Sequence, residues 1–200
     1  QFLEENGSFS HLETENGFIF LKEARIALPV GERSLLDAPL AANLQVELPN
    51  LEMMSRIFGL PALGGSIGGH IQIAGTLKAP LGRAQLNCAA VTYQNIAVGD
   101  LSIRARADVK RLDIETLVIE RGKDRATGRG TINWLENSFK DIHVELDVKD
   151  LDACVTDVFP LFWHRLERLP RIQGALKATI RLSGAFSKPE GDLNLHTRQI

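Results

Sequence analysis

The sequence predicts a mainly β protein: an elongated antiparallel sheet of repeated units, either a half-open β-sandwich or an open sheet with an apolar groove, interrupted by one or two short helices. Three observations predict this class. Apolar and polar residues alternate along several segments, turn-forming residues separate these segments about every 8–12 residues, and the strand pattern recurs about 100 residues later.

Composition narrows the class of protein. The chain has 200 residues, a formal net charge of −2 and 44% apolar residues, so it can bury a core and lacks the basic surface typical of nucleic-acid binding. No apolar run approaches the ~20 residues that span a bilayer.

The chain starts at Gln1 and ends at Ile200 within a strand-like pattern, which suggests a piece of a longer protein. We expect Cys88 and Cys154, which have no metal-ligand spacing, to be small buried apolar side chains.

The alternating segments predict strands with one apolar and one wet face, as in antiparallel sheets. They cover residues 44–48, 67–73, 101–107, 142–148 and 176–182.

Glycine and proline predict the turns between these strands. The predicted turns are Ala79–Gly82, Val98–Asp100, Arg121–Asp124 and Lys188–Gly191. In the first and last, a Pro-x-Gly sequence is expected to make the turn, because proline fixes φ and glycine tolerates positive φ.

Two segments are typical of short helices rather than strands. Asn50 is positioned to cap a helix over 51–58, and Asp150 to cap a second over 151–159. Residues 161–169 are expected to add another helical turn.

An internal repeat connects these elements. The apolar spacing from Leu44 to Leu51 recurs from Val144 to Leu151, and the Gly, Ile and Pro-x-Gly spacing of 65–82 recurs at 174–191. The repeat predicts three parts: residues 1–39 as the end of a preceding unit, 40–142 as a first repeat and 143–200 as a second, truncated repeat.

The repeated motifs resemble those of the TamB/AsmA-like family. The resemblance rests on Gly69–Gly82 (GHIQIAGTLKAPLG) and Ala126–Trp134 (ATGRGTINW), and on the order of strands over about residues 40–200. It implies a long folded-over sheet with an apolar inner groove, called a β-taco, as in bridge-like lipid transfer proteins. The expected parent is anchored in the inner membrane of a diderm bacterium and crosses the periplasm.

The resemblance implies two functions between which the sequence does not decide. One is transport of phospholipid between inner and outer membrane, with acyl chains shielded in the groove. The other is outer-membrane protein assembly, in which a strand edge adds a client strand and the partner is a barrel protein similar to TamA. The isolated chain is expected to self-associate through its strand edges.

The alternation selects candidate residues for the groove, although a plain packed core would show the same pattern. The candidates are Val46, Leu48, Ile71, Ile73, Leu101, Ile103, Leu117, Ile119, Ile132, Trp134, Val144, Leu146, Val148, Ile180 and Leu182. Phe159, Phe162 and Trp163 form a separate apolar cluster, expected to plug one end of the sheet; if exposed, the cluster would suit a partner or membrane surface.

No catalytic motif, cofactor motif or metal-ligand set is recognisable, so we expect a protein that is not an enzyme and uses no cofactor. His143 and Glu145 are two residues apart on a wet strand face, too few ligands for a closed zinc site. Gly64–Gly69 lacks the Lys-Ser/Thr of a phosphate loop and is expected to lead into a strand. A carbohydrate-active β-solenoid is a third hypothesis, disfavoured by an aromatic content of 6%.

Overall fold

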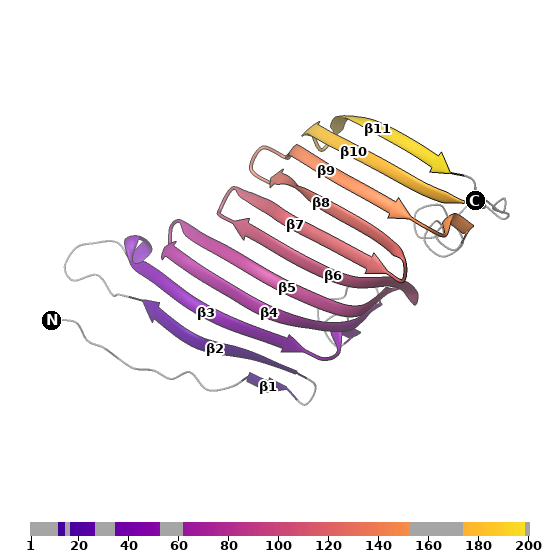
Figure 1. Ribbon diagram of the computed structural model, residues 1–200. Coiled ribbons are helices and arrows are strands. Elements are labelled where there is room, and N and C mark those ends of the chain that lie inside the picture. Colours follow the sequence, from indigo (N-terminus) through magenta and orange to yellow (C-terminus); the bar gives the residue numbers. More distant parts are fainter. Residues whose placement is uncertain (1–11, 15–16, 27–34, 53–61, 153–173, 199–200) are drawn as a thin grey trace.

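The protein forms one antiparallel sheet of eleven strands, seen in a computed structural model (Figure 1). The structure describes residues 12–14, 17–26, 35–52, 62–152 and 174–198. The sheet is open, because its strand order runs from β1 to β11 without returning to the first strand. The predicted mainly β class is therefore confirmed.

The strands follow one another in sequence, most of them through short turns, with longer connections at residues 27–38, 49–62 and 149–174. They are β1 (Leu12–Thr14), β2 (Gly17–Ile26), β3 (Pro39–Leu48), β4 (Leu63–Thr76), β5 (Pro80–Tyr93), β6 (Ile96–Ala107), β7 (Arg111–Arg121), β8 (Asp124–Asn133), β9 (Ser138–Val148), β10 (Ala175–Ala185) and β11 (Lys188–Arg198). A 3₁₀ helix, η1 (Leu35–Asp37), precedes β3 and was not predicted.

Each strand pairs with its neighbours in sequence, so the sheet is a meander. Figure 1 shows a single twisted layer, and no second layer of described elements lies over either face. Burial is correspondingly slight: the buried apolar residues of the described chain include Val46, Leu48 and Val148, and none of its large side chains is fully buried. Side chains on such a sheet are shielded mainly by their cross-strand neighbours.

Bulges interrupt several ladders and bend the strands. In β5 the pairing with β6 shifts between Cys88 and Val91, and Ala90 takes a φ of 51°. The backbone N–H of Ala90 donates to the Asp100 carboxylate at 2.8 Å, which satisfies a group that the bulge removes from the ladder. In β9 the pairing shift lies opposite Arg129 and Thr131, and Asp141 has a φ of 52°.

The Pro-x-Gly sequences do not make turns, contrary to the prediction. Pro80 and Pro189 lie within the first two residues of β5 and β11 and pair with Gly75 and Gly184. The β4–β5 turn comes earlier, where Thr76 and Ala79 exchange backbone hydrogen bonds of 3.1 and 3.4 Å. Proline is tolerated at a strand start, because a missing N–H there costs little pairing.

One further turn prediction is wrong and one is confirmed. Residues 98–100 lie inside β6, and the turn before that strand is made by Gln94 and Asn95, with φ values of 50° and 65°. Two consecutive residues with positive φ form a two-residue hairpin turn whose twist matches that of the flanking strands. Gly122 lies in the predicted turn between β7 and β8.

Both predicted helices begin where expected. Leu51 and Glu52 are helical, and the Asn50 side-chain oxygen accepts a hydrogen bond from the Glu52 N–H at 2.8 Å, as an N-cap does. Leu151 and Asp152 begin the second helix. The remaining positions of both predicted helices, the segment 161–169 and Cys154 lie outside the described residues.

The two copies of the repeated motif form hairpins of the same register. Gly75 lies opposite Pro80, and Gly184 lies opposite Pro189, with φ values of 106° and 100° at the two glycines. The sheet is continuous through the proposed divisions, since 39/40 falls within β3 and 142/143 within β9.

Gly99 should be more sensitive to substitution than Gly122. Gly99 has a φ of 106°, and an added Cβ would run into the Glu120 carbonyl oxygen, so Gly99→Ala is expected to lower the free energy of unfolding by about 3 kcal/mol. Gly122 has a φ of 61° with nothing within 4 Å of its Cβ position, and Gly122→Ala should cost only about 1 kcal/mol. Urea unfolding of both variants measures the difference, and equal losses would refute a close-packed bulge at Gly99.

Candidate functional site

The candidate site is the apolar face of the sheet. Residues directly opposite one another on antiparallel strands lie on the same side, so the pairing register shows which side chains share a face. Every groove candidate except Trp134 lies on this one face.

The register arranges this face in rows that run across the strands. One unbroken row extends from β3 to β11 and consists of Leu48, Ile67, Cys88, Leu101, Ile119, Ala126, Leu146, Ala178 and Leu195. The adjacent row consists of Val46, Gly69, Leu86, Ile103, Leu117, Gly128, Val144, Ile180 and Leu193. With strands ~4.8 Å apart, nine strands span roughly 38 Å. The two rows therefore form an apolar stripe along the long axis of the sheet.

This stripe is partly exposed. Leu48 and Ala178 retain 8% and 5% of their accessible surface, whereas Leu193 and Leu195 on the last strand retain 59% and 56%. Most other side chains in the two rows are half-buried. The apolar surface is thus continuous but not closed by any described element.

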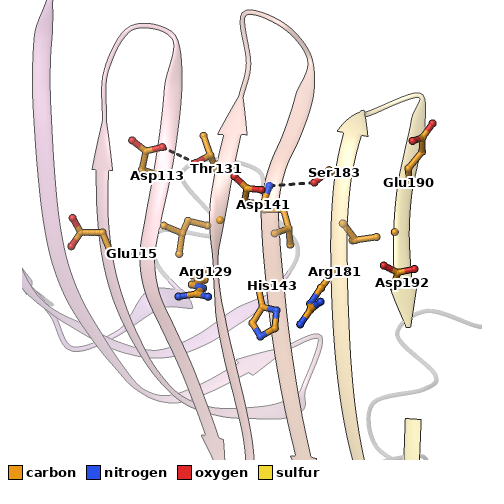
Figure 2. A pocket seen from close by; sticks show the side chains of 15 residues that line it. Asp113, Glu115, Arg129, Thr131, Asp141, His143, Arg181, Ser183, Glu190 and Asp192 are labelled. Atoms are coloured by element: carbon orange, nitrogen blue, oxygen red, sulfur yellow. Dashed lines mark hydrogen bonds between the residues drawn. The ribbon is translucent and has the colours of Figure 1, made fainter. Parts of the chain in front are cut away.

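The opposite face is polar and carries a shallow hollow of about 810 Å³ across β7 to β11. Figure 2 shows two rows of polar side chains along it. One row contains Asp113, Thr131, Asp141, Ser183 and Glu190, and the other contains Glu115, Arg129, His143, Arg181 and Asp192. Between the two polar rows, each strand has one residue whose side chain belongs to the apolar face, as Ile142 and Leu182 do.

Two of the carboxylates that line this hollow form ion pairs. Asp113 accepts a hydrogen bond from the Thr131 hydroxyl at 2.8 Å and pairs with Arg111 at 3.3 Å, while Glu115 pairs with Arg106. The Asp141 N–H donates to the Ser183 hydroxyl at 3.3 Å. The hollow is lined by five carboxylates and two arginines, so acidic groups predominate in it.

His143, which lines the polar hollow, contacts the carboxylate of Glu145. His143 Nε2 lies 3.0 Å from Glu145 Oε1, as the sequence suggested, on the polar face. Within the described ranges, no three residues among His, Cys, Asp and Glu are grouped to hold a metal ion. In the same part of the chain, no helix has the length and hydropathy needed to cross a membrane.

One groove candidate lies outside the strands. Trp134 follows the end of β8, is 43% exposed, and its indole N–H donates to the Val109 carbonyl at 2.8 Å. The alternation was extended one residue too far, because β8 ends at Asn133. The plug candidates Phe159, Phe162 and Trp163 lie outside the described residues.

The sequence interpretation missed part of the apolar face. Leu86, Cys88, Leu193 and Leu195 complete the two rows. Their alternation with polar neighbours was visible, but only the register shows that they continue rows begun on other strands. Nothing in the sequence indicated the polar hollow, because its residues come from five strands.

The surroundings of three ionisable side chains shift their pKa values. Burial raises the pKa of the Cys88 thiol, which lies on the apolar face. On the polar face, a hydrogen bond from the Lys149 ammonium lowers the pKa of Asp147, and Lys177 adds to this effect. In the β6–β7 turn, the pKa of Asp108 is lowered by the backbone N–H groups of Lys110 and Arg111, which donate to its carboxylate.

Comparison with known proteins gives no match: no family model, no curated protein and no solved structure is similar to this chain.

The Cys88 thiol should react slowly with iodoacetamide. A raised pKa leaves less thiolate at a given pH, so alkylation at pH 8 should be several-fold slower than at a cysteine on the polar face, and its rate should rise at higher pH. Asn87→Cys in a Cys88→Ala chain provides that comparison, since residue 87 is exposed on the other face. Peptide mass spectrometry distinguishes these sites from Cys154. Equal rates would contradict the burial of Cys88.

Proposed function

We propose that this chain is a segment of a TamB/AsmA-like envelope scaffold whose apolar face shields phospholipid acyl chains during transport between the inner and outer membrane. The observation that carries the proposal is the apolar stripe from Leu48 to Leu195, which has no described cover. Its parent would be anchored in the inner membrane and extend through the periplasm.

The dimensions and energetics of the stripe suit an acyl chain. A length of roughly 38 Å exceeds the ~30 Å thickness of a bilayer's hydrocarbon core, so a fatty acyl chain fits along it. Each CH₂ removed from water gains roughly 0.8 kcal/mol, so covering half of a ~16-carbon chain contributes about 6 kcal/mol.

The chemistry of the two apolar rows suits movement of a lipid along the stripe as well as lipid binding. Every residue in them is apolar, glycine or cysteine, so no charged side chain interrupts the surface along which a lipid tail would lie. The polar head group remains in water beside the strand ends. A scaffold of this kind binds lipid through the apolar surface that the lipid covers. The amount of lipid it binds therefore depends on how many strands contribute residues to the stripe.

An acidic side chain in the stripe should strongly weaken lipid binding. Leu101→Asp places a carboxylate in the middle of the first row, where covering it with an acyl chain leaves the charge unsolvated, so we expect at least about tenfold less bound phospholipid. Ser102→Asp adds the same charge on the polar face of the same strand and should bind as the unmodified chain does. Native mass spectrometry with lipid extraction measures binding, and circular dichroism verifies folding.

A well-folded, lipid-free chain in which Leu101→Asp lowers only stability would contradict the proposal. That result would favour the second function, assembly of outer-membrane proteins with a barrel partner similar to TamA. The observation on its side is the outer edge of β11, which pairs with no described strand and could add a client strand.

A further inference from the structure

Apolar side chains are exposed along one side of the sheet, where alternate strands turn. Figure 1 shows η1 and the β4–β5, β6–β7, β8–β9 and β10–β11 turns next to one another on this side. Of the large apolar side chains that are exposed in the described part of the chain, Leu81, Leu193 and Leu195 lie within strands. The others lie in η1 and these turns and form what we call the apolar rim: Leu36, Leu77, Val109, Trp134, Leu135 and Phe186.

The two-residue turns on the opposite side of the sheet differ from the rim. The β5–β6 turn consists of Gln94 and Asn95, and the β7–β8 turn consists of Gly122 and Lys123. Glycine and asparagine are favoured in turns by their backbone conformations, whereas large apolar residues have no comparable preference. Turn formation therefore does not explain the rim, and exposed apolar side chains gathered on one surface mark a site of contact.

Hydrogen bonds between neighbouring turns hold the rim in place. The Trp134 indole N–H donates to the Val109 carbonyl and the Phe186 N–H to the Asn137 carbonyl, both at 2.8 Å, so the β6–β7, β8–β9 and β10–β11 turns are joined. A backbone bond of 2.8 Å to the Leu36 carbonyl joins the β4–β5 turn to η1. The rim is therefore ordered before it meets a partner, and covering the indole leaves no unsatisfied N–H.

We propose that the apolar rim inserts into the surface of a phospholipid bilayer. Trp134 would lie at the level of the head groups, where tryptophan is enriched in membrane proteins because its ring is apolar and its N–H is polar. The strands then lead away from the membrane. The rim would place this segment at an end of the parent scaffold that meets a membrane, but the inference itself rests on the turns and does not depend on lipid binding to the apolar stripe.

The dimensions of the rim favour a bilayer over a protein partner. Successive rim turns come from every second strand, so they lie about 10 Å apart and extend over roughly 38 Å, on a layer about 10 Å thick. A strip of roughly 400 Å² is about half of the surface that each partner buries in a stable protein complex. A bilayer has no such requirement, because each apolar side chain that enters it contributes by its own area.

Charge contributes little to this contact. Within η1 and the four turns, Lys78 and Lys110 are balanced by Asp37 and Glu136, and the Asp108 carboxylate accepts hydrogen bonds from the backbone of its own turn. Apolar side chains therefore supply most of the binding, and vesicle binding should change little when salt is added, because salt screens only the charges.

Tryptophan fluorescence tests insertion directly. The chain has two tryptophans, so Trp163→Phe leaves Trp134 as the single reporter. When vesicles of phosphatidylcholine and phosphatidylglycerol are added, Trp134 emission should shift to shorter wavelength, because the ring leaves water. Phospholipids brominated on the acyl chains near the head group should quench this emission, which shows that the ring has entered the bilayer.

A carboxylate in the rim should weaken vesicle binding. Leu135 is 67% exposed in the β8–β9 turn, so Leu135→Glu should leave the fold intact and reduce vesicle partitioning about tenfold, because a leucine no longer enters the bilayer and a charge resists entry. Gln94→Glu adds the same charge to a turn on the opposite side and should bind as the unmodified chain does. Co-sedimentation with vesicles measures partitioning, and circular dichroism verifies folding.

Leu101→Asp separates the rim from the apolar stripe. This variant alters the face of the sheet and leaves the turns unchanged, so quenching of Trp134 by brominated lipid should persist in it. Loss of that quenching, an unquenched Trp134 in the Trp163→Phe chain, or equal binding by Leu135→Glu and Gln94→Glu would each overturn the proposal. A spectral shift that follows protein concentration and not vesicles would also overturn it, in favour of contact between copies of the chain.

Discussion

Hydrogen bonding between strands adjacent in sequence is the interaction on which the rest of this structure depends. Each strand from β2 to β10 satisfies both of its edges with its sequence neighbours, so the backbone pairing is completed within a single layer. The same pairing fixes the register, and the register gathers apolar side chains from many strands into rows. The apolar stripe is therefore a product of the ladder.

A single layer leaves an apolar face that its own described strands shield only in part. In a closed sandwich, residues such as Leu101 and Leu146 would pack against a facing sheet and lose nearly all contact with water. Here both remain half-buried, which leaves room for a flexible apolar molecule. The opposite face carries polar and charged side chains, some of them in local pairs such as Arg111 with Asp113.

Bulges and glycines shape this layer. The bulges at Ala90 and Asp141 bend their strands. Gly69 and Gly128 have no side chain, so the apolar row is shallower at these two positions than at their larger neighbours. Repeated use of one hairpin register at Gly75–Pro80 and Gly184–Pro189 shows how a unit of this kind can be copied along a chain.

The sequence by itself determined the mainly β class, the alternating faces, the cap at Asn50 and the turn at Gly122, because each depends on residues close together in the chain. It misplaced the turns near Pro80 and Gly99, since local glycine and proline signals do not distinguish a turn from a bulge or a strand start. It also carried the alternation past Asn133 to Trp134. Only the tertiary structure decided which apolar residues share a row and where the polar hollow lies, because those properties come from pairing between strands.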